Sequence, residues 1–187
     1  MDNPLKLNLG CGQNLFPGHI NVDKFGSPDV RHDLETFPWP WHNNSVELIV
    51  MNHCLEHLGA IASVYLRIFQ EIYRICAPDA KIIIAVPHPR HDDFINDPTH
   101  VRIVTPNSLR LFSKKMNLKW KIEKCANSPL GLFLDVDFEL DGYTHTLDPE
   151  WQNRLVKKEC SDSEFHQAIR KYNNVVKEIR MVLRVVK

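Results

Sequence analysis

The chain has 187 residues, which is long enough for one domain with its own hydrophobic core, and we expect residues 1–187 to form a single domain. Lysine plus arginine equals aspartate plus glutamate at 23 residues each, so a net charge of zero argues against general attraction to DNA, long RNA duplexes or anionic membranes. No apolar run approaches the roughly 20 residues of a membrane span, and five scattered cysteines without a Cys-x-x-Cys pair favour free thiols in a reducing cytoplasm.

The first half of the chain alternates between strand-like and helix-like segments. The predicted strands are residues 5–9, 19–22, 29–32, 46–51 and 81–86. The last two are mostly apolar runs, which is typical of strands buried on both faces of a parallel sheet. Between them, apolar residues recur at helical spacing from Ile61 to Cys76. Thr105 followed by Pro106 predicts the start of a further helix.

The second half is less regular. Residues 119–125 and 132–140 are predicted to be strands, because apolar and polar residues alternate there. Asp148 opens a polar stretch that predicts one or two helices reaching about Asn173. Residues 179–187 are rich in β-branched residues and predict a last strand.

The most informative motif is a strand that leads into Gly10-Cys-Gly12, followed by an acid, Asp23, at the end of the next predicted strand. Glycines let the backbone approach a ligand closely, and an acid in this position can accept both ribose hydroxyls. The motif therefore predicts a site for a nucleoside-like ligand. A nicotinamide cofactor is disfavoured, because position 15 is leucine and the acid comes only eleven residues after Gly12.

Several short segments together resemble class I S-adenosylmethionine-dependent methyltransferases, in the small branch with a Leu-Glu-His signature. The matching segments, in the order typical of the family, are residues 7–12, 21–23, 32–34, 44–50, 53–58, 71–74 and 83–87. The resemblance implies an α/β fold for a single methyltransferase domain. Its Rossmann-like, seven-stranded, mostly parallel sheet would carry helices on both faces and an antiparallel last strand.

The resemblance also implies a set of residues that bind S-adenosylmethionine. Gly10 and Gly12 would wrap its methionine part, and Asp23 would bind the ribose hydroxyls. The full set implied in this way is Asn8, Gly10, Cys11, Gly12, Asp23, Lys24, Asp33, Leu34, Asn52 and His53. Asp33 and Leu34 would lie beside the adenine.

Two departures from the family pattern concern the same end of the pocket. Asn8 occupies a position where the family often carries an acid. Only seven residues lie between Gly12 and Ile20, whereas a parallel crossover normally needs a dozen or more. The first crossover helix must therefore be very short, and we expect this end of the pocket to be more open than usual.

Histidines near the predicted carboxyl edge of the sheet are the candidates for the acceptor side. His53, His57 and His100 could each act as a base for a hydroxyl acceptor. His53, Glu56 and His57 could also chelate a divalent metal with His100 or Asp97, a placement that resembles the small-RNA terminal methyltransferases. In the alternative interpretation, Glu56 and His57 only order the start of a helix beside the cofactor.

Other polar and aromatic residues have two interpretations each. His88 and His91 either line the opening of the substrate pocket or are surface residues without a functional role. Trp39 and Trp41 either flank the adenine or hold a rigid loop in place.

The leading hypothesis is an enzyme that transfers a methyl group from S-adenosylmethionine to an oxygen or nitrogen of a small molecule or glycan. One alternative is methylation of an RNA end or a nucleotide, with a local basic patch as its binding surface. That patch would consist of Lys114, Lys115, Lys119 and Lys121. The other alternative is a catalytically idle protein that binds S-adenosylmethionine and regulates another methyltransferase.

Overall fold

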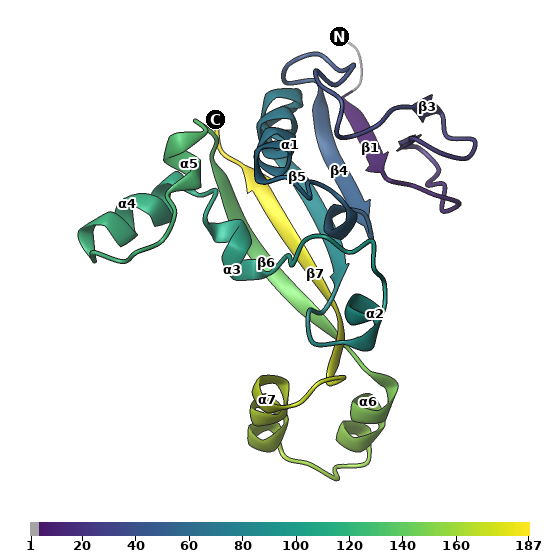
Figure 1. Ribbon diagram of the computed structural model, residues 1–187, viewed down its shortest axis with the longest axis vertical. Coiled ribbons are helices and arrows are strands. Elements are labelled where there is room, and N and C mark those ends of the chain that lie inside the picture. The colour runs from purple at the N-terminus through teal and green to yellow at the C-terminus, as the bar shows by residue number, and fades with distance from the viewer. Residues whose placement is uncertain (1–3) are drawn as a thin grey trace.

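The computed structural model describes residues 4–187, which build one seven-stranded sheet in the order β3-β2-β1-β4-β5-β7-β6 (Figure 1). The strands are β1 (Leu5–Leu9), β2 (Ile20–Asp23), β3 (Val30–Arg31), β4 (Val46–Asn52), β5 (Cys76–Pro87), β6 (Phe138–Leu147) and β7 (Val176–Val185). Strands β1 to β5 pair in parallel, and β7 runs antiparallel to both β5 and β6. The predicted seven-stranded, mostly parallel sheet with an antiparallel last strand is confirmed.

The hydrophobic core lies between the central strands and helix α1 (Ala62–Ile75). The predicted helical stripe is confirmed, because Ile68, Phe69 and Ile72 on this helix are buried. They pack in the same core as Ile49 of β4 and Ile82 of β5. Each such side chain contributes roughly 1.5–3 kcal/mol when it is fully buried, so this layer holds the sheet in a fixed register.

The remaining helices are short. They are η1 (Leu55–His57), α2 (Asp92–Ile95), α3 (Pro106–Arg110), α4 (Lys114–Ile122), α5 (Leu130–Phe133), α6 (Pro149–Val156) and α7 (Asp162–Lys171). Helix α3 begins as predicted. The side chain of Thr105 accepts a hydrogen bond from the Ser108 amide, and Pro106 occupies the first turn.

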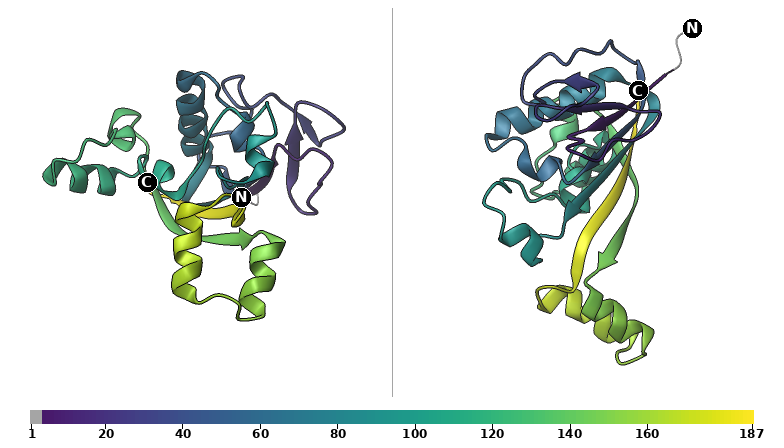
Figure 2. Two further views of the ribbon diagram at one scale, coloured as in Figure 1. Left: turned by 60° about the horizontal axis from the view of Figure 1, so that its bottom comes forward. Right: turned by 90° about the vertical axis from the view of Figure 1, so that its right-hand side faces the viewer.

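Helices α1, α2 and α3 lie on one side of the sheet in the edge view (Figure 2). The reason is the length of the early connections. No helix forms between Gly10 and Ser45, a stretch that the structure describes in full. The predicted shortening of the first crossover is therefore confirmed, and it extends to the loops after β2 and β3.

Two strand predictions in the second half were wrong. Residues 119–125 overlap helix α4, which begins after Ser113 because the Ser113 hydroxyl accepts a hydrogen bond from the Met116 amide. Residues 132–140 contain the end of α5, and strand β6 begins only at Phe138. There the chain starts to pair with β7.

Helices α6 and α7 form a lobe beyond the ends of β6 and β7 (Figure 1). Both helices have side-chain caps, from Asp148 and from Ser161. The prediction of one or two polar helices in this stretch is confirmed, and the structure has two. Within residues 4–187, all five cysteines are free and no helix is both long and apolar enough to cross a bilayer.

Candidate functional site

An open pocket of about 620 Å³, counting the space at its mouth, lies where β1, β2 and β4 end. In open parallel sheets this carboxyl edge is the usual place for a ligand. The residues that line the pocket are Gly10, Asp23, Lys24, His32, Asp33, Leu34, Glu35, His53, Cys54, His57 and Leu58. Six of them belong to the cofactor set that the family resemblance implies.

In the glycine turn after β1, Gly10 and Gly12 are glycine for different physical reasons. Gly10 has a φ of 67°, and a Cβ there would lie 2.3 Å from the sulfur of Cys54. Glycine at this position therefore lets the turn pack against the chain that leaves β4. Gly12 has a φ of 51°, and a Cβ there would meet no described atom within 4 Å. The open space beside Gly12 leaves room for a ligand against the backbone.

Asp23, the last residue of β2, points its carboxylate toward the glycine turn. One oxygen, Oδ2, accepts a hydrogen bond of 2.9 Å from the Gly12 amide, and Oδ1 accepts one of 2.9 Å from the Phe25 amide. A carboxylate offers about four lone-pair sites, so two remain for the hydroxyls of a ligand. Its cofactor role stays a prediction, but its position in the pocket suits that role.

A loop between β3 and β4 forms another wall of the pocket, and two tryptophans hold it in place. The Trp39 indole donates a hydrogen bond of 3.1 Å to the Leu34 carbonyl, and its backbone amide donates one of 2.8 Å to Glu71 of α1. Trp39 and Trp41 are both buried in the core. This arrangement favours the second interpretation of the tryptophans, as anchors of a rigid loop that positions Asp33 and Leu34.

Glu35 is a pocket residue that the sequence did not point to. Its Oε1 accepts a hydrogen bond of 2.6 Å from the Gly59 amide, which ties the β3–β4 loop to the segment after η1. Across the pocket, the Lys24 ammonium lies 3.8 Å from an oxygen of Asp33. His32, Cys54 and Leu58 were also missed, because they lie in irregular segments without a periodic pattern.

Four residues of the predicted cofactor set lie around the pocket instead of lining it: Asn8, Cys11, Gly12 and Asn52. The Asn8 amide nitrogen donates hydrogen bonds of 2.8 Å to the Asn14 carbonyl and 2.9 Å to Asn21 Oδ1. Asn8 therefore braces the chain that replaces the first crossover helix. Cys11 is buried, and burial raises the pKa of its thiol.

His53 follows β4 and lines the pocket between two carboxylates. Its Nε2 lies 2.8 Å from Glu178 Oε2, and its Nδ1 lies 3.5 Å from Glu56 Oε1. The nearby Glu56 carboxylate raises the pKa of His53, partial burial opposes this, and Glu178 raises the pKa further. The net direction is upward. Glu178 was not predicted, because only the pairing of β7 with β5 brings it to this edge of the sheet.

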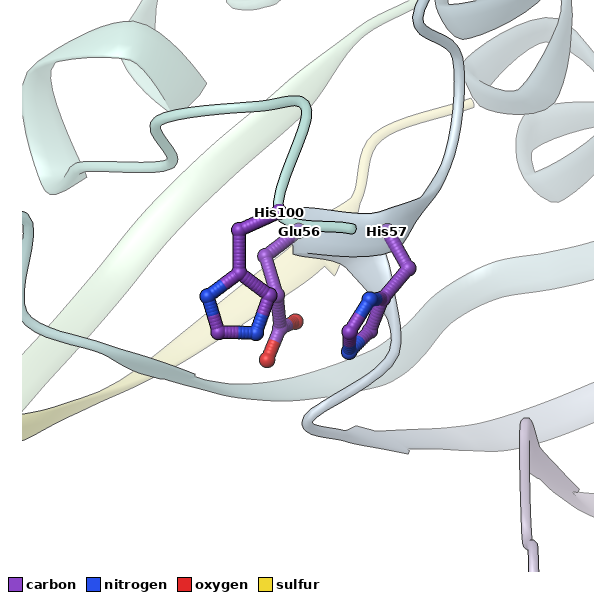
Figure 3. A group of neighbouring side chains, drawn as sticks. All are labelled: Glu56, His57 and His100. Carbon is purple, nitrogen blue, oxygen red and sulfur yellow. The ribbon is translucent and has the colours of Figure 1, made fainter. Parts of the chain in front are cut away.

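Glu56, His57 and His100 form a compact cluster beside the pocket (Figure 3). Glu56 and His57 come from η1, and His100 comes from the loop between α2 and α3. One donor atom from each residue lies within 4.8 Å of the others. The rings of His57 and His100 are 4.6 Å apart between centroids. Three of the four predicted metal candidates thus converge, while His53 turns toward Glu178.

Comparisons with known proteins identify the fold. No family model and no curated protein matches the chain. Among solved structures, a SAM dependent methyltransferase from Archaeoglobus fulgidus is 15% identical with a TM-score of 0.62, covering 97% of this chain and 86% of that chain. A SAM dependent methyltransferase from Mesorhizobium loti is 12% identical with a TM-score of 0.50, covering 96% and 90%. The chain has the class I methyltransferase fold.

A further solved structure with this fold contains ligands. It is the 1,6-didemethyltoxoflavin-N1-methyltransferase of Burkholderia thailandensis, with bound 1,6-didemethyltoxoflavin and S-adenosylhomocysteine. It is 13% identical to this chain with a TM-score of 0.54, and the alignment covers 98% of this chain and 72% of that chain. At such identities the methyltransferase fold is what the two proteins share.

Proposed function

We propose that the protein is an S-adenosylmethionine-dependent methyltransferase that acts on an oxygen or nitrogen of a small molecule or glycan. The observation that carries the proposal is the position of the pocket. It lies at the carboxyl ends of β1, β2 and β4 in a methyltransferase fold, with Gly10 and Asp23 in its wall. The prediction of a reducing cytoplasm accompanies this proposal, since the cysteines are free.

The residues of the pocket fit the chemistry of S-adenosylmethionine. Asp23 offers a carboxylate for the ribose hydroxyls, and Leu34 and Leu58 offer apolar contact for a purine ring. The backbone at Gly12 has room for the methionine part. S-adenosylmethionine supplies an electrophilic methyl group on its sulfonium, so the cofactor carries the demanding chemistry.

The protein would then bind the acceptor, exclude water and take up a proton. His53 and His57 line the pocket, whereas His100 packs against His57. A hydroxyl acceptor needs a base within hydrogen-bond distance, and histidine has a suitable pKa range. Glu178 fixes the orientation of the His53 ring, so we favour His53 as the base.

The first prediction tests the cofactor site. Asp23→Ala should weaken binding of S-adenosylhomocysteine about 10- to 100-fold, because hydrogen bonds to a charged group contribute about 1.5–3 kcal/mol. Asp23→Asn keeps one acceptor oxygen and should lose less. Isothermal titration calorimetry measures the affinities. Glu47→Ala, at a surface acid of β4, is the control. Unchanged affinity in Asp23→Ala would overturn the ribose assignment.

The alternative of an RNA-end or nucleotide substrate gains little support from the lysine patch. Lys114, Lys115 and Lys119 each lie within ion-pair distance of an acid. Those acids are Asp135, Glu139 and Glu123. In Figure 1, helix α4 and the strands β1 and β3 lie on opposite sides of the molecule. We therefore favour small molecules or glycans as acceptors.

An idle regulatory protein is distinguished from an enzyme by turnover. Release of S-adenosylhomocysteine with a panel of hydroxylated and amine-bearing small molecules and glycans would support the enzyme. Tight cofactor binding without turnover on any of them would favour the idle protein.

A further inference from the structure

We propose that Glu56, His57 and His100 bind a divalent transition-metal ion such as Zn²⁺ or Mn²⁺. Two imidazoles and one carboxylate are a donor set that first-row divalent metals accept. The chosen donor atoms lie within 4.8 Å of one another. Metal–ligand distances of about 2.0–2.2 Å place neighbouring donors roughly 3–3.5 Å apart, so side-chain shifts of about 1 Å close the site.

The strongest argument comes from Glu56. Its side chain is fully buried, and neither carboxylate oxygen has a hydrogen-bond partner within residues 4–187, where its one ion-pair contact is with His53 Nδ1 at 3.5 Å. A buried carboxylate without hydrogen bonds is costly, and buried charges in proteins are normally paired and hydrogen-bonded or coordinate a metal. In Figure 3 the carboxylate lies between the rings of His57 and His100. A cation bound between the three side chains would satisfy it.

Both histidines are held in the tautomer that a metal ligand needs. His100 Nδ1 lies 2.9 Å from the Phe94 carbonyl, which only accepts hydrogen bonds, so Nδ1 is the donor and Nε2 is the nitrogen that offers a lone pair in the neutral ring. His57 Nδ1 lies 3.3 Å from the Thr99 carbonyl, with the same consequence. Backbone carbonyls often orient metal-binding histidines in this way.

The hydroxyl of Thr99 supports the same assignment. It donates a hydrogen bond of 2.6 Å to Asp97 Oδ1, and its oxygen lies 3.0 Å from His57 Nδ1. The hydroxyl proton is therefore committed to Asp97, and His57 Nδ1 must be the donor. Asp97 Oδ2 lies 3.7 Å from His100 Nε2, which places another oxygen donor at the edge of the site.

The site belongs to the mouth of the pocket, because His57 lines the pocket as well as the cluster. Three protein ligands leave open coordination positions, as in catalytic metal sites, and these accept water or a substrate oxygen. An acceptor that carries hydroxyl or carboxylate oxygens would be favoured. This statement about the acceptor rests on the proposed function, whereas metal binding itself does not.

Isothermal titration calorimetry with ZnCl₂ and with MnCl₂, on chelator-treated full-length protein, tests the site. We expect one ion per chain for at least one of the metals, and affinity at least 30-fold weaker in His100→Ala and in Glu56→Gln. His42→Ala and His166→Ala remove exposed histidines elsewhere and should bind like the wild type. The proposal would be overturned if neither metal bound with one ion per chain. It would also be overturned if His100→Ala bound the metal as tightly as the wild type.

Two further measurements keep the test decisive. If Glu56→Gln does not fold, His57→Ala and His100→Ala carry the comparison, with circular dichroism as the check on folding. The bound metal should also raise the melting temperature of the wild type but not of His100→Ala. Asp23→Ala should bind the metal normally while it loses S-adenosylhomocysteine, so failure of the metal site and failure of the cofactor proposal give different results.

Discussion

At the scale of single residues, three positions differ in how strongly they require glycine. Gly10 combines a positive φ with a Cβ position 2.3 Å from Cys54, Gly12 has only the positive φ, and Gly142 has neither. Alanine should change the unfolding free energy little at Gly142, lower it by about 1–2 kcal/mol at Gly12, and lower it by at least about 3 kcal/mol at Gly10. Urea unfolding measures the three values. A Gly10 variant as stable as the Gly12 variant would contradict this order.

Residues that depend on local sequence were predicted, and residues that depend on distant contacts were not. Gly10 and Asp23 could be placed from the strand-and-turn pattern around them. Glu35 acts through Gly59, which is 24 positions away, and Glu178 reaches His53 across 125 positions. Only the folded chain brings such pairs together, so no local pattern identifies them.

At the scale of elements, α1 holds the β3–β4 loop through a buried ion pair. Glu71 of this helix accepts hydrogen bonds from Arg74 and from the Trp39 amide, and Arg74 also donates to the Trp39 and Trp41 carbonyls. Glu71→Ala should therefore lower the unfolding free energy by about 3 kcal/mol, because it removes the charged partner of Arg74 and leaves the buried Trp39 amide without its acceptor. Chemical denaturation measures the loss. Gln70→Ala, one position earlier on the same helix, should cost much less.

The same ion pair predicts acid sensitivity. Burial would raise the pKa of Glu71, but the hydrogen bonds from Arg74 and Trp39 and the charge of Arg74 lower it overall. A carboxyl group with a lowered folded-state pKa stabilises the fold above its unfolded pKa of about 4.5, and this contribution is lost as the pH falls through the folded-state pKa. The stability difference between wild type and Glu71→Gln should shrink below about pH 4.5. A difference that is constant from pH 7 to pH 3.5 would contradict the prediction.

Helix α4 shows why some elements could not be predicted. Alternation of apolar and polar residues in 119–125 is compatible with a strand, but Asn117 on the preceding turn is buried. Its side chain donates to the Leu111 carbonyl and accepts from the Leu132 amide. These contacts with the end of α3 and with α5 favour a helix, and no short window of sequence contains them.

At the scale of the whole molecule, the lobe of α6 and α7 is separable from the pocket. Ala168 is the buried residue of its two helices, and the pocket residues all lie before residue 60. The Asp148 amide donates to the Val175 carbonyl, so a short turn can close the β6–β7 hairpin. Replacing residues 150–173 by two glycines should change the melting temperature by less than about 5 °C and the affinity for S-adenosylhomocysteine by less than about threefold.

The lobe and the pocket can be compared in one experiment. Differential scanning calorimetry and titration with S-adenosylhomocysteine measure the shortened chain against the wild type. Loss of S-adenosylhomocysteine binding in the shortened chain would show that the lobe supports the pocket after all.

For the proposed methyltransferase, the helix-free connection between β1 and β2 bears on how fast the cofactor would be exchanged. A helix N-terminus at this place would attract the carboxylate of a bound cofactor, and here that attraction is missing. The spent cofactor, which keeps the carboxylate but loses the sulfonium charge, should therefore have a short residence time. We expect weak product inhibition by S-adenosylhomocysteine, so that methylation would respond to the supply of fresh donor more than to the accumulation of product.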